Sequence, residues 1–295
     1  MDVCVFGAGS LGSLVGGLLA REHDVTLVGR DPHVSTIRER GLRVQGAFEF
    51  VVEPRARTDP PERADLAVVT VKAFDTPAAA ATLADCDLEA CLSLQNGMGN
   101  EERLAASLDC PVLAGTCTYG AMRPEPGVVE CTGVGEVVLG PREGGESATA
   151  DRVFAAFDDA GVVTDLAADM PRRLWEKLAV NAGINPVTAL ARVENGALVE
   201  GPANDLAVTA AREVAAVARD AGVDLADAAA TDAVERVATA TAANTSSMHQ
   251  DVLAGRRTEV DAISGYVVDH ADRPVPATAT MTQLLRAWER ERGLR

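Results

Sequence analysis

The stretch that decides the fold is Val3-Cys4-Val5-Phe6-Gly7-Ala8-Gly9-Ser10-Leu11-Gly12. An apolar run of buried-strand length precedes a G-x-G-x-x-G pattern, and a helix-like run over 11–22 follows it. Gly7 permits a tight turn, Gly9 lets a pyrophosphate approach the backbone, and Gly12 allows the helix to pack closely on the sheet. The phosphates of such a site bind N–H groups at the helix N-terminus. We therefore expect a dinucleotide-binding loop rather than the alternative, a glycine-rich structural turn, and its residues are Gly7, Ala8, Gly9, Ser10, Leu11 and Gly12.

The next strand-like run bears on the choice of dinucleotide. Residues 25–28 are apolar and are followed by Gly29-Arg30-Asp31. NAD sites usually carry Asp or Glu at this strand tip, where the carboxylate accepts from the ribose 2′-hydroxyl, whereas an arginine nearby suits the 2′-phosphate of NADP. Gly29 followed by Arg30 favours NADPH. NADH stays open, because Asp31 could serve the ribose while Arg30 is solvated.

Strand-like and helix-like segments alternate through the first half of the chain. The strand-like runs are residues 3–6, 25–28, 66–71, 91–94 and 112–114, with helical stretches at 11–22 and 77–84. This alternation predicts a parallel sheet covered by helices on both faces. Two later runs, 128–131 and 136–139, predict a hairpin added to the edge of the sheet.

After about Asp165 the pattern becomes helical. Ala-rich stretches with an apolar period near 3.6 cover 171–182, 202–221, 227–242 and 280–292, and at least one more helix is expected within 249–270. The fold class is therefore α/β. We expect an N-terminal Rossmann-like dinucleotide-binding domain over 1–167 and an all-α substrate-binding and catalytic domain over 168–295.

Composition excludes several classes of protein. The net charge of −17 argues against a nucleic-acid or anionic-membrane partner. The six cysteines lack metal-ligand spacing and the four histidines are isolated, so we expect no metal site. No apolar run is long enough to cross a bilayer. We expect a cytoplasmic protein with reduced thiols and a small-molecule substrate; the sequence leaves a homodimer open.

The chain contains only two lysines, Lys72 and Lys177, against 25 arginines. An ammonium group can act as an acid, whereas a guanidinium cannot give up its proton at accessible pH. Lys177 begins a series with Asn181 and Asn185, spaced i, i+4, i+8 along one side of a predicted helix. Asparagine is a poor helix former and is costly to bury without partners, so this stripe indicates the polar wall of a binding site. The alternative is a solvated helix face.

Six motifs in chain order resemble those of the ketopantoate reductase family. They are the 7–12 loop, Thr70-Val71-Lys72-Ala73, Gln95-Asn96-Gly97-Met98-Gly99, residues 174–186, residues 244–248 and Thr258-Glu259-Val260-Asp261. The resemblance covers nearly the whole chain. It implies reduction of 2-dehydropantoate to pantoate with NADPH, on the route to pantothenate and coenzyme A.

The resemblance also implies roles for individual residues, with Lys177 as the proton donor. The implied cofactor-binding residues outside the 7–12 loop are Arg30, Lys72, Asn96, Ala121 and Glu259. The implied substrate-binding residues are Asn96, Lys177, Asn181, Asn185, Asn195, Asn244, Thr245, Ser246 and Ser247. Gln95 and Tyr119 depart from the family pattern, where relatives carry other polar residues. Two other functions remain open: a reductase of another bulky 2-keto acid, including a related β-hydroxyacid dehydrogenase, and a non-catalytic NADP-sensing regulator.

Overall fold

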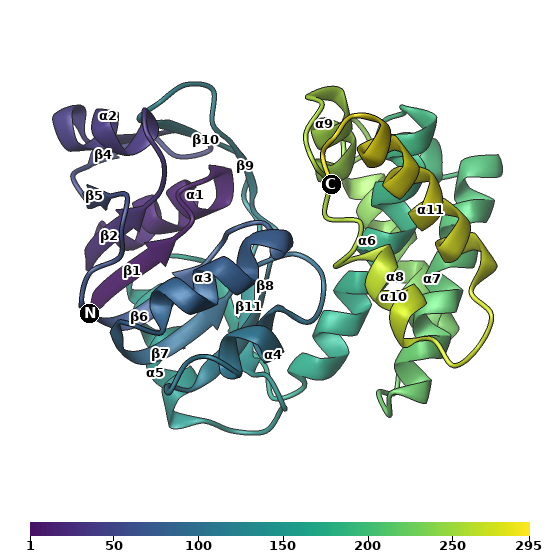
Figure 1. The fold of residues 1–295 in the computed structure, drawn as a ribbon, viewed down its shortest axis with the longest axis horizontal. Helices are drawn as coiled ribbons and strands as arrows, with labels where there is room; N and C mark the ends of the chain where they lie inside the picture. Colours follow the sequence, from purple (N-terminus) through teal and green to yellow (C-terminus); the bar gives the residue numbers. More distant parts are fainter. The chain divides into compact units, whose positions relative to one another are not determined.

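The computed structural model describes all residues from Met1 to Arg295 and divides the chain into two compact units (Figure 1). Unit 1 comprises Met1–Gln95 and Asn100–Met170. Unit 2 comprises Asn96–Gly99 and Pro171–Arg295. The short segment Asn96–Gly99 therefore belongs with helices that follow it by more than seventy residues in the chain.

Unit 1 is built on an eight-stranded sheet with the order β12-β11-β8-β7-β6-β1-β2-β5. Its strands are β1 (Asp2–Phe6), β2 (Asp24–Val28), β5 (Arg55–Arg57), β6 (Arg63–Val69), β7 (Asp87–Ser93), β8 (Val112–Cys117), β11 (Val137–Pro141) and β12 (Thr164–Leu166). The six strands from β5 to β8 run parallel, which confirms the predicted α/β class. The strand order reverses between β1 and β6, and ligands of open α/β sheets bind at such a switch point, beyond the carboxyl ends of the strands.

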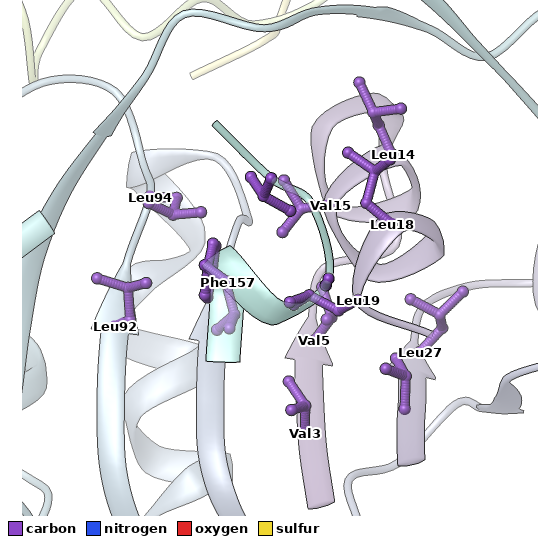
Figure 2. Packing of buried hydrophobic residues seen from close by; sticks show 14 of the residues in the cluster. Val3, Val5, Leu14, Val15, Leu18, Leu19, Leu27, Leu92, Leu94 and Phe157 are labelled. Atoms are coloured by element: carbon purple, nitrogen blue, oxygen red, sulfur yellow. The ribbon is translucent and has the colours of Figure 1, made fainter. Parts of the chain in front are cut away.

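Both faces of this sheet are buried, because alternate side chains of each strand enter different cores. Val3 and Val5 lie in one core with α1 (Ser10–Leu19) and α5 (Ala148–Asp159), from which Phe157 is fully buried (Figure 2). Ala67 and Val69 face the opposite core with α3 (Thr76–Leu83) and α4 (Asn100–Ala105). The continuous apolar strands seen in the sequence follow from this two-sided burial.

A second, four-stranded sheet packs against α1 in the order β4-β3-β10-β9. Its strands are β3 (Leu42–Gly46), β4 (Phe50–Val52), β9 (Gly120–Met122) and β10 (Val128–Gly133). The helix α2 (His33–Arg40) precedes β3 along the chain.

The predicted hairpin of 128–131 with 136–139 is wrong. β10 pairs with β3 and β9 in the second sheet, whereas β11 pairs with β8 and β12 in the first. The backbone N–H of Thr118 donates to Glu136 O at 2.9 Å, and the N–H of Glu136 donates to Thr118 Oγ1 at 2.9 Å. β8–β9 and β10–β11 are thus two arms of one long antiparallel ribbon. A register shift near Cys131 and Gly133 lets its two halves join different sheets.

Unit 2 is helical. Its elements are α6 (Met170–Ala191), the short 3₁₀ helix η2 (Asn195–Leu198), α7 (Pro202–Asp220), α8 (Asp227–Ala240), α9 (Ser247–Leu253), α10 (Ser264–His270) and α11 (Pro276–Glu291). Its core is rich in small residues, with Ala207, Ala211 and Ala215 of α7 fully buried. No helix of the chain combines the length and the apolar character needed to cross a membrane.

Helix α6 runs nine residues beyond the predicted end at 182 and contains Pro186. A proline inside a helix removes one N–H donor, which normally favours an end at that point. Here the helix continues, and the Thr188 hydroxyl donates to Ile184 O at 2.8 Å. This extension includes Asn185, in the same helix as Lys177 and Asn181.

Candidate active site

The loop between β1 and α1 is fixed by contacts that only glycine allows at two positions. Gly7 has φ +116°, and its backbone N–H donates to Val28 O at 3.0 Å. A Cβ on Gly7 would lie 2.7 Å from Val71 N, and one on Gly12 would lie 2.2 Å from Gly7 O. Thr70, just after β6, donates its hydroxyl to Gly7 O at 2.9 Å. The turn is therefore held between the end of β2 and the residue after β6, the two strands on either side of β1.

The start of α1 fits a dinucleotide pyrophosphate. Its N-cap is Gly9, no side chain caps the helix, and the first turn carries no acidic residue. The first N–H groups of any helix lack acceptors within it, so those of Ser10 and Leu11 are available to an anion. A Cβ on Gly9 would meet nothing closer than Gly7 O at 3.8 Å, so the space beside this exposed residue is open. The loop offers backbone donors and a positive dipole beside this open space.

Arg30 and Lys72 follow β2 and β6, the strands on either side of β1. The Arg30 side chain is 92% exposed, and its guanidinium lies 3.9 Å from Asp75 Oδ2. Lys72 is half-buried and directly precedes the 3₁₀ helix η1 (Ala73–Asp75). The Arg30–Asp75 ion pair therefore brings Arg30 beside the loop that carries Lys72. Asp31, two residues before α2, instead accepts from Ser35 N at 3.1 Å in the first turn of that helix, so its carboxylate is already engaged there.

A buried amide network, which the sequence analysis missed, supports the loop of Lys72. The Gln95 Nε2 group donates to Val71 O at 3.0 Å and to Thr76 Oγ1 at 2.7 Å. The Thr76 hydroxyl donates to Asn100 Oδ1 at 2.9 Å. These bonds tie the loop after β6 to the end of β7. The sequence signal was a glutamine that directly follows a buried strand.

The Lys-Asn-Asn stripe of unit 2 lies on successive turns of α6. Lys177 and Asn181 are half-buried, and Asn185 is 6% exposed. Thr188, on the next turn, is fully buried, and its Oγ1 lies 2.7 Å from Ser246 Oγ. The polar stripe therefore continues to the N-cap residue of α9. Sequence reasoning did not find Thr188, because a threonine after a proline gives no distinctive pattern.

The predicted substrate segment 244–247 combines structural and exposed groups. The Ser246 hydroxyl accepts from His249 N at 3.2 Å and so caps α9. Asn244 and Ser247 are exposed, and Thr245 is half-buried. Asn195 is buried on η2, where its backbone N–H donates to Asn244 O at 3.0 Å and its side chain donates to Thr241 Oγ1 at 2.8 Å. Asn195 therefore holds the segment 241–244 in place through these two hydrogen bonds.

The segment that carries Glu259 is held from two directions within unit 2. Met98 N donates to Ala262 O at 2.9 Å, which joins the Asn96–Gly99 segment to the residues just after Glu259. The Thr258 N–H and hydroxyl donate to the same oxygen of Glu289, at 2.8 and 2.6 Å. Glu259 itself is 5% exposed. The structure thus brings Asn96 and Glu259, far apart in sequence, onto connected segments.

Two arginines complete the support of this segment. Arg295 Nε donates to Glu289 Oε2 at 2.8 Å, and Arg286 Nε donates to Asp261 Oδ1 at 2.9 Å. Burial opposes ionisation of Asp261, but its hydrogen bonds with Arg286 and Arg295 dominate and lower the pKa of its carboxyl. No local sequence pattern indicated Glu289 or Arg295, because Thr258 and Asp261, their partners in this segment, lie 31 and 34 residues away.

A buried histidine links the nucleotide loop region to the second sheet. Ser13 Oγ of α1 lies 2.9 Å from His33 Nε2, and Gly127 N donates to His33 Nδ1 at 3.0 Å. Because Nδ1 accepts, Nε2 carries the proton and donates to Ser13. Burial is the larger cause, and the positive charge of Arg123 the smaller one, that together lower the pKa of His33 to about 4. His33 is therefore neutral in the folded protein at pH 7.

This depressed pKa predicts a loss of stability in mild acid. The unfolded chain takes up a proton at His33 near its ordinary pKa of 6.5, whereas the folded chain does so near 4. Stability from this residue is therefore lost as the pH falls from about 6.5 towards 4, by about 2 kcal/mol between pH 7 and pH 5. Urea unfolding of the wild type and of His33→Gln at both pH values measures it. An equally steep pH dependence in the variant would contradict the assignment.

The fold and these residues define a class: NAD(P)-dependent oxidoreductases with a Rossmann-like unit followed by a helical unit. Residues 3–144 match the family model described as "Ketopantoate reductase PanE/ApbA", and residues 169–289 match "Ketopantoate reductase PanE/ApbA C terminal". The chain belongs to the ketopantoate reductase family.

Individual relatives agree with this assignment. The chain is 45% identical to the 2-dehydropantoate 2-reductase of Halobacterium salinarum, over 99% of this chain and 100% of the relative. The chain is also similar to a PanE/ApbA family ketopantoate reductase from Ralstonia eutropha, known from a crystal structure. The sequence identity is 33%, the TM-score is 0.91, and the match covers 99% of this chain and 100% of that one. D-mandelate dehydrogenase with NADH and anilino(oxo)acetate shares the fold at 24% identity, a TM-score of 0.92 and full coverage of both chains.

Proposed function

We propose that this protein reduces 2-dehydropantoate to pantoate with NADPH, and so serves the synthesis of pantothenate and coenzyme A. The observation that carries the proposal is the Lys177, Asn181 and Asn185 stripe of α6, in a chain similar over its whole length to 2-dehydropantoate 2-reductases. A non-catalytic regulator would be free to lose this stripe.

Reduction of a 2-keto acid needs a hydride at the carbonyl carbon and a proton at the carbonyl oxygen. The nicotinamide supplies the hydride when it is bound. Lys177 donates a hydrogen bond that polarises the carbonyl, and its proton then passes to the oxygen as negative charge develops there. An arginine in its place could polarise the carbonyl but could not give up a proton.

The neighbouring polar groups orient the substrate without adding charge beside Lys177. Asn181 and Asn185 donate amide N–H groups to the carboxylate and hydroxyl of the keto acid, together with Ser247 and the segment that Asn195 anchors. Being neutral, these donors leave the Lys177 ammonium free to serve the keto oxygen. Asn96, Ala121 and Glu259 contact the cofactor, and Asn96 also contacts the substrate.

The preference for NADPH rests on Arg30 and Lys72. The two cations, Arg30 after β2 and Lys72 after β6, suit the 2′-phosphate, and Asp31, the residue that would serve an NAD ribose, already bonds Ser35 N. Charge-assisted hydrogen bonds to phosphate are stronger than neutral ones and are absent with NADH.

Neutral substitution of both cations tests this preference. In the double variant Arg30→Gln, Lys72→Gln, NADPH affinity is expected to fall by about 1–3 kcal/mol, because two charge-assisted bonds to the 2′-phosphate are lost. NADH affinity should stay within a factor of about two, since NADH lacks that phosphate. Fluorescence titration with both cofactors measures the two affinities. Equal losses would mean that the residues hold the loop instead.

A substrate panel tests the proposed reaction against the other two readings. NADPH oxidation is followed with 2-dehydropantoate and with other branched and aromatic 2-keto acids at matched concentrations. The proposal expects the highest kcat/KM for 2-dehydropantoate. A higher value for another keto acid would identify a different reductase, and NADPH binding without turnover on any of them would identify a regulator.

A further inference from the structure

The connection between β9 and β10 is fastened at both ends to the surroundings of the nucleotide loop. At its far end, Gly127 donates its N–H to His33 Nδ1 at 3.0 Å and accepts from Arg43 N at 2.9 Å. His33 in turn bonds Ser13 of α1. At its near end, Arg123 Nη1 donates to Ala8 O at 3.1 Å, in the middle of the glycine loop. All of these residues belong to unit 1.

The charge placed on the loop by Arg123 has no partner of opposite sign. The chain carries 44 acidic residues against 27 Lys and Arg, yet no carboxylate forms an ion pair with Arg123. Its guanidinium instead bonds a neutral carbonyl, two residues before the uncapped start of α1. The helix start is itself positive, by roughly half an elementary charge. Two positive groups held together in this way are stabilised by an anion that touches both.

A guanidinium has five N–H donors in a planar fork, and the bond to Ala8 O uses one of them. The remaining donors match phosphate oxygens, which arginine binds in a bidentate manner. Arg123 is also exposed and extends from the strand that carries Ala121, so its free N–H groups are open to a ligand.

We propose that Arg123 binds the pyrophosphate of the dinucleotide, as a side-chain donor that completes the backbone donors at the start of α1. The proposal rests on the proposed function only in requiring that the loop binds a nicotinamide dinucleotide. It separates two kinds of cation in unit 1. Arg30 and Lys72 bind the 2′-phosphate, which only NADPH has, whereas Arg123 binds the pyrophosphate that both cofactors share.

The test compares three ligands in the variant Arg123→Met. NADPH and NADH, titrated without any keto acid, should each bind about tenfold or more weakly, because a charge-assisted bond common to both is lost. Adenosine 2′-phosphate, which lacks the pyrophosphate, should compete with NADPH with an unchanged inhibition constant. Arg123→Lys should recover part of the affinity for both dinucleotides, since it keeps the charge. Arg55→Met is the matched control: Arg55 is an exposed arginine on the edge strand β5, where it pairs with Thr26 in the middle of β2, and its replacement should change none of these values.

Each outcome decides the matter. Unchanged affinity for both dinucleotides in Arg123→Met overturns the proposal, and so does an equal loss for adenosine 2′-phosphate, which would make Arg123 a support of the adenosine side. If Arg123→Met does not fold, Arg123→Lys takes its place. The proposal is then overturned if Arg123→Lys binds NADPH as tightly as the wild type but binds adenosine 2′-phosphate tenfold more weakly. Failure of the proposed reaction would look different: the wild type would bind NADPH, with the Arg123 effect intact, but would not reduce 2-dehydropantoate.

Discussion

Replacing Lys177 with alanine is expected to lower kcat for reduction of 2-dehydropantoate by at least about 100-fold, because the proposed general acid is lost. NADPH affinity should stay close to the wild-type value, since the residues proposed to bind the 2′-phosphate and the pyrophosphate all lie in unit 1. Lys177→Arg should be nearly as slow as Lys177→Ala, because a guanidinium keeps the charge but retains its proton.

The matched control is Arg173→Ala, which removes a cation from an exposed position one turn earlier on the same helix. It should leave kcat within about a factor of two, as surface substitutions usually do. Steady-state kinetics at saturating NADPH and keto acid separate the variants. Near-normal turnover of Lys177→Ala would remove Lys177 from the chemistry, and normal turnover of Lys177→Arg would show that charge alone suffices.

Replacing Glu289 with alanine is expected to lower the free energy of unfolding by about 3 kcal/mol, because two buried donors of Thr258 and the part-buried Nε of Arg295 lose their acceptor at once. Glu289 is fully buried and accepts from Thr258 N, Thr258 Oγ1 and Arg295 Nε. Glu289→Gln should be milder, since its amide oxygen can still accept from Thr258. The same loss should loosen the segment of Glu259 and raise the KM for both substrates.

Denaturant unfolding followed by tryptophan fluorescence measures this effect, because Trp175 and Trp288 both lie in unit 2. The matched control is Glu291→Ala, at an exposed position two residues further on the same helix. That substitution should change the free energy of unfolding by less than about 0.5 kcal/mol. A loss in Glu289→Ala no larger than in the control would mean that the Thr258 contacts contribute nothing.

The parts of the fold that were predictable depend on neighbouring residues in the chain. The glycine pattern, the strand before it and the helix after it specify one turn locally, and the parallel sheet follows from the repeated alternation. The predicted hairpin of 128–131 with 136–139 failed for the opposite reason. Which sheet each arm joins depends on β3 and β8, partners distant in sequence, and a shift of register near Cys131 decides it.

The residues of the candidate site also divide into those that the sequence could indicate and those that only the fold reveals. Lys177, Asn181 and Asn185 could be selected from the sequence, because helical spacing alone aligns them on one side of α6. The residues that support the site could not. Glu289 reaches Thr258 across thirty-one positions, and Arg123 reaches Ala8 across 115, so neither pair leaves a local pattern. Residues that act through tertiary contacts are visible only in the fold.

Transfer of a labelled hydride tests the central claim most directly. The protein is incubated with 2-dehydropantoate and NADPH that carries deuterium at C4 of the nicotinamide, in two preparations labelled on opposite faces, and the product is analysed by mass spectrometry. The account predicts pantoate with one deuterium at C2 from one of the two preparations, and none from Lys177→Ala within the time of many wild-type turnovers. Unlabelled pantoate from both preparations, or no pantoate at all, would contradict it.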